Sequence, residues 1–240
     1  MVTRHFFDKE LDDLHLDLIK MGSLVEESIE NTILALKKQD VELARKIFKN
    51  DDVIDDMESK IERNCFNLIA RQSPLAKDLR TISTALKIIT DMERIADHSA
   101  DIAEITIRMA NEKYIKPLID IPKMAELAKI MVNKSIDAYI RQDVELAQKV
   151  CDSDDEVDDL FHKIILELTN IMKNDPQTIE QATNFMFIAK YLERMADHAT
   201  NISEWVVYNV TGEHEHLTRH MDHRDDRIHN PFIIDEDSEK

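Results

Sequence analysis

Two stretches of the sequence carry acidic side chains at a spacing that suits metal binding. The first reads ERIADHSADIAE over residues 93–104, and the second reads ERMADHATNISE over residues 193–204. In each stretch an aspartate follows a glutamate four positions later, and residues four apart lie on one face of an α-helix. Clustered carboxylate oxygens suit Mg²⁺, Mn²⁺, Ca²⁺ or iron, so the repeated pattern predicts a metal site in each half of the chain.

The acids of each stretch continue the apolar side of the expected helix. Asp97 lies about 40° and Asp101 about 80° round the helix from Glu93, because successive residues are about 100° apart. The apolar residues of the preceding turns fall within about 40° of Glu93 on the same scale: Leu79, Ile82, Leu86 and Ile89. The acids are therefore expected to face neighbouring helices rather than water.

A second acidic row precedes each of these stretches. In the later copy, Asp154 and Asp158 interrupt a row of apolar residues at helical spacing, and Asp51 and Asp55 hold the matching positions in the earlier copy. Each copy therefore directs acids from two helices towards a shared seam. Facing helices of a bundle commonly build metal sites in this way.

Partly buried carboxylates destabilise a fold unless an opposite charge compensates them. The stripe offers no lysine or arginine at matching positions, and we expect Arg94 and Arg194 to point about 100° away. A bound multivalent cation is the simplest compensation. The alternative is an ordinary solvated face, which a register error of one residue would produce.

The acids belong to an internal repeat of about a hundred residues. KQDVELA at residues 38–44 returns as RQDVELA at residues 141–147, and the aspartates within 51–56 return within 154–159. A repeat of this length is too long for a solenoid unit, and it indicates a duplicated domain.

Each copy divides into three long helical segments. Asp40 and Asp143 are expected N-caps, and Ser73-Pro74 and Asp175-Pro176 each place a capping side chain before a proline at the first helical position. The predicted helices cover residues 6–37, 40–72, 74–112, 120–140, 143–173 and 176–210. Long helices with short connections predict an all-α fold, built as a tandem pair of antiparallel three-helix bundles.

The expected domain boundary lies between Tyr114 and Pro122, a stretch that holds two prolines. Residues 1–113 would form the first bundle and residues 120–212 the second. Residues 213–240 are expected to form a flexible acidic and histidine-rich tail.

Composition agrees with this organisation. The 240 residues include only 2 glycines and 5 prolines, fewer than sheet-rich folds need for their turns. The net charge of −18 argues against a nucleic-acid binder and favours cations or basic protein surfaces as partners. We expect a cytoplasmic protein, because the sequence has no long apolar run and no signal peptide, and Cys65 and Cys151 make no disulfide framework.

Several motifs together resemble the signature of the PhoU family of phosphate-transport accessory regulators. They are Phe7-Asp8-Lys9-Glu10-Leu11, Met21-Gly22, Val25-Glu26, Arg71-Gln72-Ser73-Pro74-Leu75-Ala76-Lys77-Asp78-Leu79-Arg80, Leu86-Lys87-Ile88 and Glu93-Arg94-Ile95-Ala96-Asp97. The resemblance covers residues 4–212. It implies a tandem pair of three-helix bundles that carries multinuclear metal clusters, commonly of iron or zinc, with manganese or magnesium as further possibilities.

The resemblance also implies which residues hold these clusters. In the first copy they would be Asp51, Asp55, Glu93, Asp97 and Asp101, and in the second Asp154, Asp158, Glu193 and Asp197. The chain departs from the family pattern at Ala96 and Ala196, where glycine is frequent. Asn201 replaces the third acid of the first copy, and Phe161 stands at the position of Glu58. The second site therefore carries fewer charges, and we expect it to bind fewer ions or to bind them more weakly.

The function that the resemblance implies is negative regulation of phosphate uptake and of the phosphate-starvation response. The protein would be a non-enzymatic, metal-binding adaptor between the ATPase subunit of a phosphate ABC transporter and a membrane sensor histidine kinase. It would act as a homodimer, at the inner face of the membrane through these partners and without membrane insertion.

Two alternatives stay open at the level of sequence. Carboxylate-bridged metals can activate water, so a metal-dependent phosphohydrolase or oxidase is conceivable. Di-iron oxidases use an ExxH motif, however, and His98 and His198 directly follow Asp97 and Asp197, which turns them towards another face. The clusters could also sense phosphate directly, because only metals offset the repulsion of a chain with a net charge of −18.

Overall fold

The structure, a computed structural model, describes residues 2–72, 74–213 and 217. The described part of the chain consists of helices and the segments that connect them and contains no strand, which confirms the predicted all-α fold. Its elements are α1 (Val2–Lys38), α2 (Val41–Gln72), α3 (Ala76–Met109), α4 (Asp120–Arg141), α5 (Val144–Asn174), the short 3₁₀ helix η1 (Pro176–Thr178) and α6 (Ile179–Thr211). Within this part, no helix is both long enough and apolar enough to cross a membrane.

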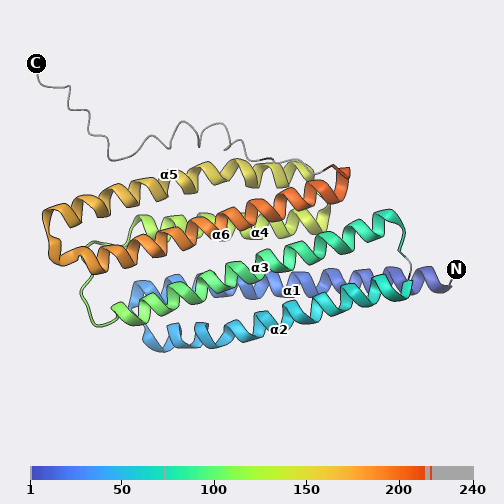
Figure 1. The fold of residues 1–240 in the computed structure, drawn as a ribbon, viewed down its shortest axis with the longest axis horizontal. Coiled ribbons are helices and arrows are strands. Elements are labelled where there is room, and N and C mark those ends of the chain that lie inside the picture. The colour runs from blue at the N-terminus through green and yellow to red at the C-terminus, as the bar shows by residue number, and fades with distance from the viewer. Residues whose placement is uncertain (1, 73, 214–216, 218–240) are drawn as a thin grey trace, which may run out of the picture.

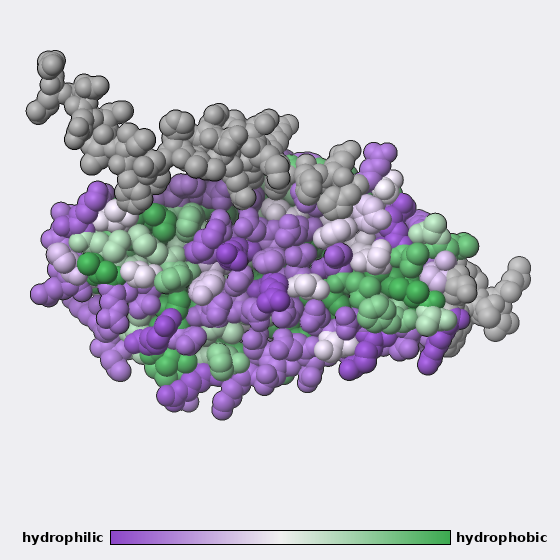
Figure 2. All heavy atoms as spheres, viewed as in Figure 1, coloured by the Kyte–Doolittle hydropathy of each residue, from purple (hydrophilic) through white to green (hydrophobic). Residues whose placement is uncertain are grey.

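The six helices form two antiparallel groups of three that lie side by side (Figure 1). Helices α1 to α3 make one group and α4 to α6 the other, as the internal repeat predicts. The groups meet where α3 packs along α6 and α1 packs along α4. One cluster of buried apolar side chains runs through both groups, so the two repeats share a continuous core. Hydrophilic side chains cover the middle of the face in Figure 2, with hydrophobic patches towards both ends.

The first turn of each repeat is built in the same way. Gln39 and Gln142 both have φ of 53°, a left-handed conformation that ends the preceding helix. Asp40 and Asp143 follow, and their carboxylates accept hydrogen bonds from the backbone N–H groups of Leu43 and Leu146 at 3.0 and 2.9 Å. Both predicted N-caps are confirmed, and they set the rotational start of the helices that carry the first acidic rows.

The second turn differs between the repeats. The prediction that Pro74 begins a helix is wrong, because α3 begins at Ala76 and the Asp78 carboxylate accepts the Leu75 N–H at 3.3 Å. In the second repeat the prediction is confirmed: Asp175 accepts the Gln177 N–H at 3.0 Å, and Pro176 begins η1. In α3 an acid inside the first turn thus bonds the backbone at the start of the helix, whereas Ser73, the expected cap, lies outside the described residues.

The domain boundaries at 113 and 120 stay a prediction. The segment between α3 and α4 contacts both repeats: Tyr114 donates a hydrogen bond to the Leu36 carbonyl at 2.7 Å, and the Ile115 N–H donates to Gln181 at 2.6 Å. The tail predicted over 213–240 lies outside the described residues, apart from Glu213 and Leu217.

A close approach between α1 and α4 depends on Gly22. A Cβ atom on Gly22 would lie 2.6 Å from Cδ1 of Ile136, which is inside van der Waals contact. Gly22 therefore lets α1 and α4, one from each repeat, pack at short range.

Substituting Gly22 tests this packing. We expect Gly22→Leu to lower the free energy of unfolding by about 1–3 kcal/mol, because a large side chain cannot be accommodated without moving Ile136 and its helix. Urea unfolding followed by circular dichroism measures the change. Leu24→Ala, on the same helix and only partly buried, should cost less; equal stability of Gly22→Leu and the wild type would contradict the close packing.

Candidate metal centre

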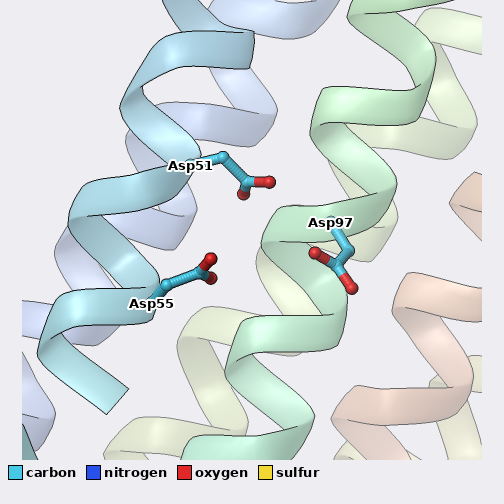
Figure 3. Close-up of side chains that lie close together, drawn as sticks. All are labelled: Asp51, Asp55 and Asp97. Atoms are coloured by element: carbon cyan, nitrogen blue, oxygen red, sulfur yellow. The ribbon is translucent and has the colours of Figure 1, made fainter. Parts of the chain in front are cut away.

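Three aspartates from two helices converge in the first repeat. Asp51 and Asp55 project from α2, four residues apart, and Asp97 projects from the facing turn of α3 (Figure 3). Each residue offers one carboxylate oxygen, and these oxygens all lie within 4.8 Å of one another. Oxygens at this separation can coordinate one cation together after small side-chain adjustments.

The electrostatic environment of this trio disfavours its own negative charge. Burial, followed by repulsion from Asp97 and Asp55, raises the pKa of Asp51 to about 6. Burial and the charge of Asp97 also raise the pKa of Asp55. On α3, burial and then Asp97 raise the pKa of Glu93 to about 7, against the opposing effect of Arg94. A bound cation would remove this repulsion, so the residues present fit a metal with hard oxygen ligands.

Glu93 and Asp101 lie one turn to either side of Asp97. Asp101 is close enough to Asp51 to contribute to its raised pKa, but its carboxylate also lies 3.5 Å from Nδ1 of His98. Neither Glu93 nor Asp101 belongs to the trio. They are further carboxylates on α3 beside the three that converge.

The second repeat places its acids at the equivalent seam between α5 and α6. Asp154 is 3% exposed and Glu193 is 7% exposed, so these two carboxylates are more buried than their counterparts in the first repeat. Burial, then the charges of Asp197 and Asp158, raises the pKa of Asp154 to about 7. Within the described residues, no second group of three acids converges as closely as the trio in the first repeat.

The prediction that no basic side chain reaches the acidic seams is wrong. Arg94 places Nε 3.3 Å from Glu93 and Nη1 2.9 Å from Asp97. Lys190 places Nζ 2.5 Å from both carboxylate oxygens of Glu193. These long flexible side chains bend back towards the acids even though their Cα atoms lie on another side of the helix. The spacing of three residues from Arg94 to Asp97 and from Lys190 to Glu193 is the signal in the sequence that would have revealed these two pairs.

The two histidines of the repeated motif face the contact between the repeats, as their position next to the acids suggests. The rings of His98 and His198 are 5.8 Å apart between centroids, and His98 stacks on Tyr191 at 5.3 Å. Nδ1 of His198 lies 2.8 Å from the Asp91 carboxylate. These residues join α3 to α6 across the pseudo-symmetric centre of the fold and lie outside the acidic trio.

The raised pKa values predict how the stability of the metal-free protein depends on pH. The folded state holds extra protons on Asp51, Glu93 and Asp154 between about pH 4 and pH 7. The contribution of these three groups to the free energy of unfolding is therefore fully present below about pH 4. It is lost as the pH rises through about 6 to 7. The urea concentration at the midpoint of unfolding, measured in the presence of a chelator, should therefore fall as the pH rises across this range.

A triple variant separates these groups from the general charge of the chain. Asp51→Asn, Glu93→Gln and Asp154→Asn together should flatten the fall in urea midpoint between about pH 4 and pH 7. Asp56→Asn, an exposed acid of α2 outside the trio, serves as the control with one charge removed. A triple variant with the same slope as the wild type would contradict the account.

Comparisons with known proteins agree with this architecture. The family model described as PhoU domain matches residues 18–106 and again residues 121–206. A PhoU homolog of Clostridium acetobutylicum, named a phosphate-specific transport system accessory protein, is 43% identical over 88% of this chain and 97% of its own length. A second one, from Aquifex aeolicus, is 43% identical over 87% of this chain and 96% of its own length.

Solved structures give the same result. The crystal structure of PhoU from Pseudomonas aeruginosa covers 86% of this chain and 100% of its own, with a TM-score of 0.83 and 34% identity. The phosphate transport system regulatory protein PhoU from Streptococcus pneumoniae covers 88% of this chain and 99% of its own, with a TM-score of 0.81 and 30% identity. The duplicated helical chain described here belongs to the PhoU family.

Proposed function

We propose that this protein is an accessory regulator of phosphate transport. The observation that carries the proposal is the match of both repeats to the PhoU domain, together with 43% identity to relatives named as phosphate-specific transport system accessory proteins. The match extends over nearly the whole length of those relatives, so it includes both repeats and both acidic seams. The role is negative regulation: the protein restrains phosphate uptake and the phosphate-starvation response when phosphate is plentiful.

The proposal includes metal clusters at the acidic seams. In the first repeat Asp51, Asp55 and Asp97 would hold the ion, with Glu93 and Asp101 completing a larger cluster, and in the second Asp154, Asp158, Glu193 and Asp197 would do so. Iron or zinc is the expected metal, with manganese or magnesium as further candidates. A bound ion would neutralise the carboxylates and cross-link α2 to α3, and α5 to α6, so that the surface offered to partners becomes rigid.

The proposed partners are proteins of the phosphate system. They are the ATPase subunit of a phosphate ABC transporter and a membrane sensor histidine kinase, which the adaptor would link at the cytoplasmic face of the membrane, as a homodimer. The net charge of −18 supports binding to basic protein surfaces and speaks against a nucleic-acid partner. The long helices offer extended surfaces for such contacts, and the hydrophilic middle of the face in Figure 2 suits a polar interface.

We propose a non-enzymatic role because no observation favours catalysis. A di-iron oxidase would direct a histidine into the carboxylate cluster, whereas His98 and His198 contact each other between the repeats. Turnover of a phosphate ester by the metal-loaded protein, abolished by Asp97→Asn, would favour the enzyme instead.

Metal analysis tests the proposed centre. Protein purified without a metal-chelating column should contain stoichiometric iron, zinc or manganese, and Asp51→Asn, Asp55→Asn and Asp97→Asn combined should remove the share bound by the first repeat. Asp56→Asn should retain the full metal content, since it lies outside the trio. Equal metal content in the wild type and the triple variant would contradict binding at this seam.

A genetic experiment tests the regulatory role. Deleting the gene should raise expression of phosphate-starvation genes several-fold in phosphate-rich medium, and the wild-type gene should restore repression. The triple aspartate variant should restore it poorly if bound metal shapes the partner surface. Unchanged expression in the deletion strain would contradict the role in phosphate regulation.

A further inference from the structure

Lys190 places a positive charge inside the acidic seam of the second repeat. Its Nζ lies 2.5 Å from both carboxylate oxygens of Glu193, one turn further along α6. The same Nζ lies 5.4 Å from the centroid of the Phe161 ring on α5. The Lys190 side chain is 41% exposed, whereas that of Glu193 is 9% exposed, so the ammonium covers the carboxylate from the solvent side.

The first repeat has no such cation at the equivalent position. Thr90 stands a hundred residues before Lys190, and its hydroxyl donates a hydrogen bond to Glu58 at 3.3 Å. Glu58 in turn occupies the position that Phe161 holds in the second repeat. The neutral threonine and the acid of the first repeat are thus replaced by an ammonium and an aromatic ring, which changes the local charge by two units in the positive direction.

These replacements place a positive charge beside the acids that would hold a metal ion in the second repeat. The ammonium already neutralises the charge of Glu193, and a divalent cation bound near this carboxylate would be repelled by the ammonium. Phe161 supports the ammonium through a cation–π contact. The first seam has a basic side chain of its own, because Arg94 contacts Glu93 and Asp97, but Asp51, Asp55 and Asp97 still converge there.

We propose that Lys190 is a built-in counter-cation that makes the two metal centres unequal. Resting on the metal binding proposed above, the inference is that the α2–α3 centre binds a divalent ion first. The α5–α6 centre binds one only at higher concentration, after the ammonium has left Glu193. The duplicated chain would thereby respond to metal over two concentration ranges, with residue 190 setting the upper one.

Calorimetric titration with Mn²⁺ tests this directly on the full chain. Asp51→Asn, Asp55→Asn and Asp97→Asn form a background in which only the second centre remains. In that background, Lys190→Gln should strengthen Mn²⁺ binding by about tenfold or more, because one competing charge is gone. Lys190→Arg, which keeps the charge, should resemble the background, and Lys173→Gln, which removes a charge from the exposed end of α5, should change affinity little. Adding Asp154→Asn and Asp158→Asn gives the blank for binding elsewhere.

The reciprocal exchange tests the same idea in the first centre. With the second centre removed by Asp154→Asn and Asp158→Asn, Thr90→Lys should weaken Mn²⁺ binding by about tenfold. Adding Glu58→Phe, which supplies the aromatic support, should weaken it further.

Thermal unfolding gives a readout that does not depend on activity. Metal-free Lys190→Gln should unfold about 2–4 °C below the wild type, because Glu193 stays buried without its ammonium, and Mn²⁺ should raise the midpoint of the variant more than that of the wild type. Equal Mn²⁺ affinity of Lys190→Gln and Lys190→Arg would overturn the role of Lys190 while leaving the centres intact. If the wild type bound Mn²⁺ at neither centre, the proposed metal binding itself would be overturned.

Discussion

The central constraint on this structure is an unfavourable one. Carboxylates point between helices, where they repel each other. Asp51, Asp55 and Asp97 bring three oxygens within 4.8 Å, and the pKa of Asp51 rises to about 6 because of burial and this repulsion. An all-apolar seam would stabilise α2 against α3 better, since buried like charges oppose folding. Retaining acids in both copies of a duplicated chain is understandable if the seam serves a cation. The rest of the fold, long helices joined by tightly capped turns, holds these side chains in register.

Duplication supplied two seams, and local substitutions then made them different. The turns before α2 and α5 are the same, with φ of 53° at Gln39 and Gln142. The seams differ where Lys190 and Phe161 replace Thr90 and Glu58 and where Asn201 replaces Asp101. Asn201 donates to Asp91 across the contact between repeats at 3.4 Å, whereas Asp101 lies beside His98 on its own helix. Both repeats hold a base beside their acids, Arg94 in the first and Lys190 in the second, but among the described residues three acids converge only in the first.

The fold and the position of the acids at the seam between helices could be predicted from the sequence because both depend on local rules, although Asp55 is exposed and the Asp101 side chain is 43% exposed. Asp40 and Asp143 begin helices through their own side chains, and helical periodicity places Glu93, Asp97 and Asp101 beside the apolar stripe. Three features escaped this reasoning. The start of α3 moved to Ala76 because Asp78 caps it from inside the first turn. Arg94 and Lys190 reach the acids because a flexible side chain of several bonds is not confined to the direction of its Cα atom. Asp51, Asp55 and Asp97 converge, whereas the acids of the second repeat do not converge as closely. This difference depends on how the two helices of each seam pack against each other, which the periodicity of a single helix does not predict.

The most direct test of the central claim is anomalous X-ray diffraction from crystals of this protein grown with Mn²⁺. The account predicts an anomalous peak between α2 and α3, with carboxylate oxygens of Asp51, Asp55 and Asp97 about 2.2 Å from it. Ordered water alone between these three side chains, at saturating Mn²⁺ and neutral pH, would contradict it.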